Sequence, residues 1–450
     1  MTAVLELEAT GLDPARARIE LLCDPGTFRP VRTAVGDGVV AGRGRAGGRP
    51  VFCWAQDGSF RGGSLGAAGG ETILRTIEAA ERAGAPVVGF PHSGGARLQE
   101  GVAALAAYAA IFRAQANATV PQIAVVSGPC AGGAAYSPAL GDVTVMCGPQ
   151  ARMFLTGPKI VLEVMREEVT AEELGGAAVQ GANGVCHLTA GGAAEAARLV
   201  LDVLAHLPSR AGGPLPLAPA ADPEPGDPSE PVPAEFRRVY DVRDVARRLV
   251  DAGRLLELAP AWAPNLVTAL ARLEGSPIGI VANQPRRLGG TIDCAAADKG
   301  AWFVDFCDRF GIPLLVLVDT PGFLPGVRQE RDGVIRRGAA FLRAFARARV
   351  PRVTLTLRQA FGGAYIVMNA RDLGADLSLA WPQARIGVMG AKPAVELLER
   401  RAIAAGADAD ALAAAYEAEH LGIGTSARLG FVDEVVAPAE TRERLVEALT

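Results

Sequence analysis

The strongest constraint on this chain is that its second half repeats the landmarks of its first half. Gly48-Arg-Pro-Val-Phe returns as Gly275-Ser-Pro-Ile-Gly, at an offset of 227 residues (275 − 48). Further matches follow in the same order, and the offset drifts to 230 (350 − 120) and 233 (382 − 149): Gly84 with Gly311, Val120 with Val350, and Pro149 with Pro382. Because solenoid repeats are much shorter, a repeat of this length indicates two duplicated domains.

The 450 residues therefore divide into two domains of ordinary size, at 1–207 and 236–450. The segment between them, 208–235, is rich in proline, has few large apolar residues and shows no periodicity. This composition predicts a stiff, extended, solvent-exposed linker.

Short apolar segments alternate with helical patterns along both halves. Dense apolar runs predict strands, and spacing near 3.6 residues predicts helices. The predicted strands of the first half are 39–44, 51–55, 87–90 and 122–127, and its helices are 14–22, 70–83 and 98–116. The second half has predicted helices at 242–249 and 402–419, then a last strand and helix from Phe431 onward. This order predicts an α/β fold with helix-covered sheets.

Composition excludes several classes of protein. The net charge is −4 and acids and bases are mixed along the chain, so no basic stripe is available for nucleic acid. The cysteines lie singly in apolar surroundings, which predicts buried reduced thiols and disfavours zinc or disulfide frameworks. These cysteines are Cys23, Cys53, Cys130, Cys147, Cys186, Cys294 and Cys307.

The start of the chain predicts a cytoplasmic protein. Glu6, Glu8, Asp13 and Glu20 stand where a signal peptide would need an apolar core. The longest apolar runs are also too short to span a bilayer, so no membrane association is expected.

Each half carries two glycine-rich turns that follow buried strands. Ala131-Gly-Gly-Ala recurs as Phe361-Gly-Gly-Ala, and Ser93-Gly-Gly-Ala corresponds to Thr320-Pro-Gly-Phe. Glycine permits positive φ and carries no Cβ, so successive N–H groups can point at one oxygen beside a helix start. A lone Gly-Gly pair would more simply allow close packing, but its recurrence in both halves favours two oxyanion-binding sites.

Histidine is too scarce for the usual metal or Ser-His-Asp sites. The four histidines are His92, His187, His206 and His420, and none recurs at the repeat offset. His92 matches Asp319 across the repeat (319 − 92 = 227), and packing at a strand end is favoured for it over ligand contact.

Three further sequence patterns bear on possible catalytic or binding sites. Gly62-Gly-Ser-Leu-Gly has the hydrolase spacing, but no apolar strand leads into Ser64, so we treat it as a chance match. The polar segments at Arg97 and Arg328 follow glycine turns, and they either begin solvated helices or shape a substrate cleft. No phosphate-binding loop or dinucleotide motif stands between a strand and a helix, so ATP and NAD chemistry are not expected.

Long motifs in both halves resemble one family of enzymes. In the first half they begin at Gly36, Gly62, Ser93, Gly128 and Glu172; in the second half they begin at Tyr240, Val281, Asp319, Phe361 and Val388. Examples are Ser93-Gly-Gly-Ala-Arg-Leu-Gln-Glu-Gly-Val and Asp319-Thr-Pro-Gly-Phe-Leu-Pro-Gly. The chain resembles the carboxyltransferase β-subunits of biotin-dependent acyl-CoA carboxylases, with the related methylmalonyl-CoA carboxyltransferases and decarboxylases.

The resemblance implies two tandem crotonase-like domains and a homohexamer, in which the N-terminal half of one chain faces the C-terminal half of another. It also implies roles for particular residues. Gly132 and Gly133 would bind the thioester oxygen of an acyl-CoA, and Gly363 and Ala364 would bind the ureido oxygen of biotin. The further substrate-binding residues implied are Gly94, Gly95, Ala96, Ala131 and Ile366, the last lining the acyl pocket.

The implied reaction moves CO2 from carboxybiotin to the α-carbon of a short acyl-CoA, such as acetyl- or propionyl-CoA, through a thioester enolate. The biotin ureido anion removes the α-proton, so no protein base and no metal are needed, in agreement with the scarcity of histidine. A decarboxylase or transcarboxylase with the same pockets is the alternative. Because the chain lacks a Met-Lys-Met biotinylation motif and any ATP-binding pattern, a separate biotin carboxylase and a biotin carboxyl carrier are the implied partners.

The chain departs from the family pattern at five positions. His92 stands in place of a usual Asp, Gly69 and Thr72 replace His and Lys, and Gln180 and Gln359 replace His and Lys. These changes remove charge from regions implied to meet CoA or biotin. They leave open an unusual acyl substrate or decarboxylation in place of carboxylation.

Overall fold

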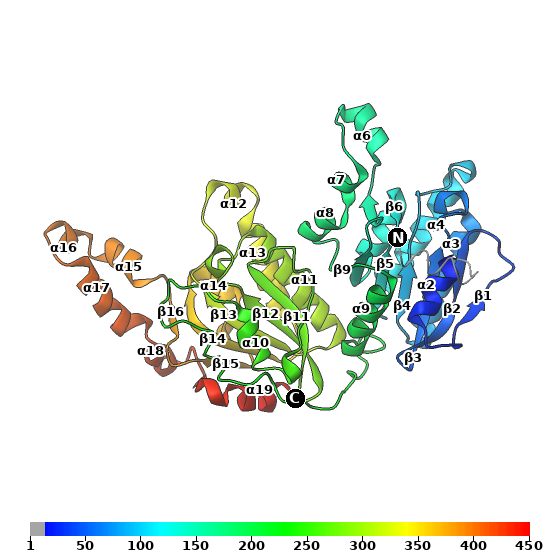
Figure 1. Cartoon of the computed structure of the whole chain (residues 1–450). Coiled ribbons are helices and arrows are strands. Elements are labelled where there is room, and N and C mark those ends of the chain that lie inside the picture. Colours follow the sequence, from blue (N-terminus) through cyan, green and yellow to red (C-terminus); the bar gives the residue numbers. More distant parts are fainter. Residues whose placement is uncertain (1–13) are drawn as a thin grey trace. The chain divides into compact units, whose positions relative to one another are not determined.

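The computed structural model describes residues 14–450, so Glu6, Glu8 and Asp13 lie outside the described residues. The chain divides into two compact units, Met1–Pro214 and Leu215–Thr450 (Figure 1). The division lies inside the proline-rich segment 208–235. Within residues 14–450, no helix combines the length and the apolar character needed to cross a membrane.

The described part of the first unit is built on a seven-stranded sheet in the order β1-β2-β3-β4-β5-β7-β9. The first three strands form an antiparallel meander, and the others continue it in parallel. The strands are β1 (Arg29–Val31), β2 (Val39–Ala46), β3 (Arg49–Gln56), β4 (Val87–Phe90), β5 (Gln122–Val126), β7 (Val143–Cys147) and β9 (Leu188–Ala190). A separate parallel pair joins β6 (Pro129–Ala131) to β8 (Arg152–Phe154).

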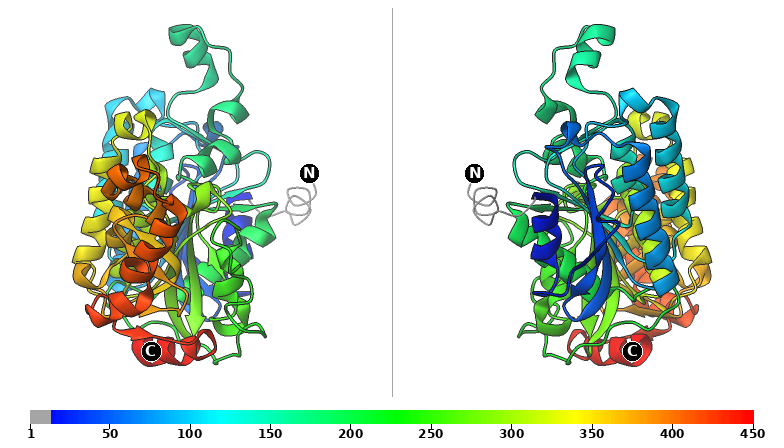
Figure 2. Two further views of the ribbon diagram at one scale, coloured as in Figure 1. Left: turned by 90° about the vertical axis from the view of Figure 1, so that its left-hand side faces the viewer. Right: turned by 90° about the vertical axis from the view of Figure 1, so that its right-hand side faces the viewer.

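Helices cover both faces of this sheet (Figure 2). Side chains alternate between the faces of a strand, and β3 shows the result. Cys53 faces Cys23 at the end of α2 (Pro14–Leu22), whereas Trp54 packs in the core with Ile73 and Ile77 of α3 (Ala67–Ala83). The other covering helices are α9 (Ala193–His206), which packs on α2, and α4 (Val102–Asn117), which packs on α3.

The second unit repeats this plan, with the sheet order β10-β11-β12-β13-β14-β15-β17 in the described residues. Its strands are β10 (Leu256–Glu257), β11 (Leu266–Leu273), β12 (Ser276–Asn283), β13 (Leu314–Thr320), β14 (Arg352–Phe361), β15 (Leu377–Ala380) and β17 (Glu434–Val435). The long strand β14 spans the region that β5 and β6 share in the first unit, and its end pairs with β16 (Arg385–Gly387).

Two pairs of helices enclose this second sheet. Leu315 and Leu317 of β13 share a core with α10 (Val242–Arg247) and α19 (Thr441–Leu449). By alternation, Val316 and Val318 face the opposite side, where α11 (Cys294–Phe310) and α13 (Val334–Arg347) pack together. The predicted α/β fold with helix-covered sheets is confirmed in both units.

Matching isolated bridges show the duplication in three dimensions. Leu65 pairs with Ala96, and Ile292 pairs with Phe323, each 227 residues later. Arg152 likewise bridges to Gly176, as Arg385 does to Gly422.

The remaining helices are α5 (Tyr136–Leu140), α6 (Pro158–Met165), α7 (Ala171–Gly175), α8 (Ala177–Ala182), α12 (Val327–Arg331), α14 (Gly362–Val367), α15 (Ala391–Leu398), α16 (Arg400–Ala404), α17 (Ala409–Tyr416) and α18 (Ile423–Arg428).

The prediction of one helix over 402–419 is wrong. Helix α16 ends at Ala404 and α17 begins at Ala409. Gly406 has φ of +98°, a left-handed conformation that interrupts a helix, and the Asp408 carboxylate accepts hydrogen bonds from the N–H groups of Asp410 and Ala411. Local capping therefore overrides the helical propensity of the alanines.

The segment 208–235 contains no helix or strand, but much of it is not a free, solvent-exposed linker. From Leu215 onward it is attached to the second unit: the Ala218 N–H donates to Gly275 O at 3.0 Å, and the Glu224 N–H donates to Arg247 O at 3.2 Å. Val232 packs against the main core of that unit. Its prolines therefore stiffen an extended segment that packs on the second unit. The range 208–235 remains the proposed boundary between the domains.

All seven cysteines lie in the described residues and are buried free thiols, as predicted. Burial raises the pKa of Cys130 to about 12, so this thiol, one residue before the first Gly-Gly turn begins, stays protonated at neutral pH. It acts there as a small apolar side chain.

Candidate functional site

The first Gly-Gly turn joins β6 to a short helical segment. Gly132 has φ of +62°, in the left-handed region that favours glycine. It opens a 3-10 turn (Gly132–Ala135) that continues into α5, and the first N–H groups of such a segment have no partner inside it. Gly133 has little free space, because a Cβ there would lie 3.3 Å from the ring of Tyr108.

The preceding glycine turn lies directly beside this one. The Ser93 N–H donates to Pro129 O at 2.7 Å, and the Ala131 N–H donates to Ser93 O at 2.9 Å. Gly95 has φ of +106°, and a Cβ there would lie 3.2 Å from Ala131 O. The structure thus brings the predicted site residues of the first half together at one edge of the sheet: Gly94, Gly95, Ala96, Ala131, Gly132 and Gly133.

The second unit builds the same turn. Gly362 has φ of +59°, nearly that of Gly132, and stands 230 residues after it. Gly363 follows as an exposed residue at the start of α14, and a Cβ there would lie 3.7 Å from the ring of Phe323 in the neighbouring Thr320–Phe323 turn. In this register Gly133 corresponds to Gly363, so the predicted pair Gly363 and Ala364 lies one residue further along than Gly132 and Gly133.

A match to known proteins accompanies this paired geometry. The family model described as the carboxyl transferase domain matches residues 8–450. The chain belongs to this family. It is 43% identical over 484 residues to the propionyl-CoA carboxylase beta chain of Saccharopolyspora erythraea, covering 99% of this chain and 89% of that one.

Two further relatives agree. The methylmalonyl-CoA carboxyltransferase 12S subunit of Propionibacterium freudenreichii subsp. shermanii is 44% identical over 463 residues, covering 98% of this chain and 88% of that one. A crystal structure of a transcarboxylase 12S hexamer, with methylmalonyl-coenzyme A and methylmalonic acid bound, matches with a TM-score of 0.93 and 43% identity, covering 100% of this chain and 91% of that one. The expected family, crotonase-like fold and carboxyltransferase activity are confirmed.

Arg97 of this carboxyl transferase has a buried side chain, although it is the cap residue of a short, largely exposed 3-10 turn, Leu98–Glu100. Its guanidinium pairs with Asp37 and with Glu100, and donates to Ser64 O at 2.7 Å. Glu100 also accepts from the Ala67 N–H at 2.6 Å, and hydrogen bonds from Ala67 and Arg97 lower the pKa of its carboxyl. Arg97 therefore ties the end of the Ser93–Ala96 turn to Asp37 and Ser64. Its place directly after the turn could have indicated this role.

His92 and Ser64 have structural roles. A methyl group at Gly58 or Gly128 would overlap the His92 ring, and burial, with the nearby Arg18, lowers the pKa of this imidazole. The Ser64 hydroxyl donates to Arg61 O at 2.9 Å, after a 3-10 turn and not after a strand. The packing role favoured for His92 and the chance match at Ser64 are both supported.

The other departures from the family pattern lie in different settings. The Gly69 N–H donates to Asp37, the Thr72 hydroxyl accepts from Arg32 Nε at 3.0 Å, and Gln180 donates to Met153 O at 2.6 Å inside the first unit. Gln359, in contrast, lines a cavity of the second unit. It stands two residues before Phe361, which leads into the second Gly-Gly turn.

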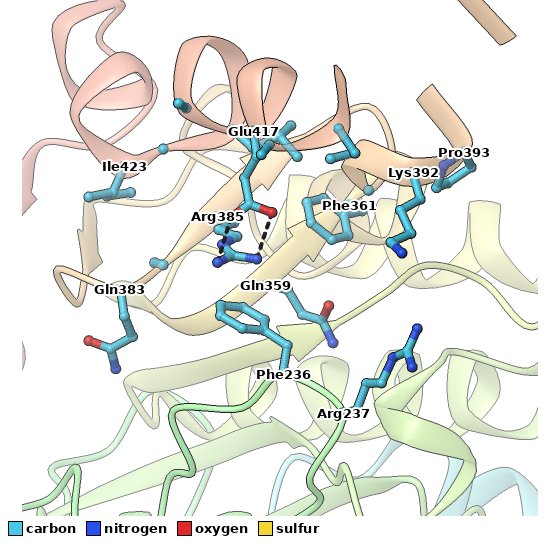
Figure 3. A pocket seen from close by; sticks show the side chains of 18 of the residues that line it. Phe236, Arg237, Gln359, Phe361, Gln383, Arg385, Lys392, Pro393, Glu417 and Ile423 are labelled. Atoms are coloured by element: carbon cyan, nitrogen blue, oxygen red, sulfur yellow. Dashed lines mark hydrogen bonds and ion pairs between the residues drawn. The ribbon is translucent and has the colours of Figure 1, made fainter. Parts of the chain in front are cut away.

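This cavity of about 890 Å³ lies beside the second Gly-Gly turn (Figure 3). Phe236, Gln359 and Phe361 line it, and Arg385 reaches Glu417 at 2.6 Å across its wall. Neither Phe236 nor Arg385 is among the site residues predicted from the sequence. A signal existed, because Arg385 ends the repeated Pro-Gln-Ala-Arg motif and its counterpart Arg152 pairs with Glu172 at 2.6 Å.

Proposed function

We propose that this carboxyl transferase moves CO2 from carboxybiotin to the α-carbon of a short acyl-CoA, as the carboxyltransferase subunit of an acyl-CoA carboxylase. The proposal rests on one turn that recurs in both units. In each unit a glycine in the left-handed region, Gly132 or Gly362, opens a helical segment. The reaction develops negative charge on two oxygens, one on each reactant. Two such turns match that requirement.

The proposed roles follow from the backbone donors. N–H groups of Gly132 and Gly133 hold the thioester oxygen as the enolate forms, beside Gly94, Gly95, Ala96 and Ala131. N–H groups of Gly363 and Ala364 hold the ureido oxygen of biotin. Removing one such donor typically costs about 3 to 4 kcal/mol of activation free energy.

Carboxybiotin is a substrate here, and it supplies both the CO2 and the base. The bond from its ureido nitrogen to the carboxyl carbon breaks, the resulting ureido anion takes the α-proton of the thioester, and the enolate carbon forms the new bond to CO2. The chain itself orients the two reactants and stabilises their oxygens. Ile366, on α14 three residues after Gly363 and 47% exposed, is proposed to line the site of a short apolar acyl group.

The partners we propose are a biotin carboxylase and a biotin carboxyl carrier, together with further copies of this chain in a homohexamer. The names of the relatives support this: one is the beta chain of a propionyl-CoA carboxylase, and the 12S protein is described as a hexamer. We also propose that the protein is cytoplasmic.

Transcarboxylation or decarboxylation is the second candidate, since the 12S relative is a methylmalonyl-CoA carboxyltransferase. The test is an assay of the purified chain with free biotin and either malonyl-CoA or methylmalonyl-CoA, measuring release of acetyl- or propionyl-CoA. Biotin-dependent release is expected. Release that does not need biotin would contradict both candidates, because both use the biotin pocket, and no release from either thioester would contradict the proposal.

A further inference from the structure

Arg358 is a cation enclosed in the second unit, close to the second Gly-Gly turn. It stands on β14, three residues before Phe361, and its side chain is 2% exposed. Its Nε donates to Asp319 Oδ2 at 2.8 Å, and Asp319 is fully buried. Burying two charges is costly, so a buried pair adds little net stability even where further hydrogen bonds satisfy it, and its contribution lies in what it holds in place.

The pair joins three segments that are distant in sequence. Asp319 lies near the end of β13 and leads into the Thr320–Phe323 turn, and it also accepts from the Tyr240 hydroxyl at 2.8 Å. The other arm of Arg358 donates to Arg238 O at 2.9 Å and to Glu235 O at 3.3 Å. One guanidinium therefore holds the segment 235–240 and the two strand ends that lead into both glycine turns.

The first unit shows that the fold itself does not require this ion pair. At the repeat offsets of 227 and 230, Asp319 corresponds to His92 and Arg358 to Gly128. There the imidazole of His92 packs against the bare Gly128 backbone, so these two positions form no ion pair with each other. The buried ion pair is specific to the second turn.

Arg358 is also linked to the cavity. The ring of Phe236 lies close to two guanidinium groups, with its centroid 5.8 Å from Cζ of Arg358 and 3.8 Å from Cζ of Arg385. Arg385 in turn pairs with Glu417 in the cavity wall, as Figure 3 shows. A shift of Arg358 would therefore move both the turn and the wall beside it.

We propose that Arg358, through Asp319, is the positioning residue of the second Gly-Gly turn and holds Gly363 and Ala364 in the geometry that receives the biotin ureido oxygen. This inference rests on the proposed function. It assigns Arg358 to one reactant only, because the thioester is held by the first unit.

The test compares Arg358→Gln with Arg442→Gln in the full chain. Arg442 is the matched control, since it also joins a buried carboxylate, Asp251, and backbone carbonyls, at Leu249 and Ala221, but it lies on elements that do not lead into a Gly-Gly turn. It also pairs with the more exposed Glu274. With free biotin and methylmalonyl-CoA, Arg358→Gln is expected to lower kcat by about 100-fold, as a misplacement near 1 Å can. The KM for free biotin should rise, and the KM for methylmalonyl-CoA should stay within about 2-fold.

The control should keep the parent kcat and both KM values. Unchanged kinetics of Arg358→Gln, equal effects on both KM values, or the same kinetic loss in Arg442→Gln would overturn the inference. If Arg358→Gln does not fold, Asp319→Asn combined with Arg358→Gln removes both buried charges, and a folded double variant with the parent kcat would also overturn it. Failure of the proposed function is distinct, because the parent chain itself would then transfer nothing.

Discussion

The Thr144 N–H donates to Nδ1 of the buried His187 at 2.9 Å, and its copy in the second unit, the Ser378 N–H, donates to Asp433 Oδ2 at 2.8 Å. In both units the same two residues make a second hydrogen bond between their backbones. The backbone N–H of His187 donates to Thr144 O, and the backbone N–H of Asp433 donates to Ser378 O, each at 2.9 Å. Duplication has kept this pair of hydrogen bonds at the next-to-last strands β7 and β15 while changing its chemistry. Only a neutral imidazole can accept at Nδ1.

Acid should therefore weaken the first unit through His187. Burial lowers the pKa of this imidazole from 6.5 to about 4 in the folded chain. The stability from the neutral ring is complete above pH 6.5 and is lost as the pH falls toward 4, because the unfolded chain takes up the proton first. Between pH 7 and pH 5 we expect a loss of about 2 kcal/mol in the free energy of unfolding of the first unit.

Urea unfolding of the parent and of His187→Asn at both pH values measures this. The asparagine amide oxygen can accept the Thr144 N–H and does not titrate, so the variant should lose clearly less stability on acidification. An identical pH dependence in the two proteins would show that His187 is not the responsible group.

Gly363→Ala should abolish most transfer while leaving the fold intact. The added Cβ makes only an ordinary contact with Phe323, but it stands on the exposed turn where the ureido oxygen is proposed to bind. Alanine keeps the N–H, but its Cβ would hold the oxygen away from the donors, so we expect kcat to fall by about 100- to 1,000-fold, as when an oxyanion donor is lost. Ala364 is a poorer test position, since it is fully buried and a larger residue there would disturb packing.

Gly424→Ala is the control for this variant. Gly424 is exposed on α18, and the nearest atom to a Cβ there is Arg428 Nη1 at 4.0 Å. Alanine in a helix is more stable than glycine by up to about 1 kcal/mol, so the control should melt slightly higher and keep full activity. Full transfer by Gly363→Ala would count against its proposed role.

Asp37→Asn should destabilise the first unit through Arg97. The variant leaves a buried guanidinium with Glu100 as its remaining carboxylate partner. Because Asp37 is partly exposed, we expect a cost of about 2 kcal/mol, between the values for surface and fully buried pairs. Denaturant unfolding measures it, with Arg75→Gln, which breaks the exposed pair with Glu71, as a control expected to cost clearly less. Equal losses in the two variants would rule out a bracing role for Asp37.

Ile366→Ala should change the choice of acyl chain more than stability. Ile366 is half-exposed, so truncation removes little buried surface. If its side chain lines the acyl pocket, the ratio of kcat/KM for butyryl-CoA to that for propionyl-CoA should rise by about 10-fold, as expected for one or two methylenes. Competition between the two thioesters measures that ratio, and an unchanged ratio would place Ile366 outside the pocket.

Much of the architecture could be predicted because it depends on local requirements. The strand and helix order follows from apolar spacing, and the paired turns follow from glycines whose positive φ excludes most other residues, as Gly132 and Gly362 show. The break at 405–408 was missed although its signals, Gly406 and Asp408, are local, because the alanine pattern around them is strongly helical.

The sequence by itself determined two duplicated α/β domains and the places where backbone N–H groups are exposed at helix starts, since these depend on residues a few positions apart. Only the tertiary structure decided which polar side chains are buried and what they hold. Asp37 meets Arg97 across 60 residues and Asp319 meets Arg358 across 39, and the 208–235 segment is bound to the second unit. No periodicity marks such pairs, because each charge can be buried only where the fold brings its partner close enough to offset the cost of losing water.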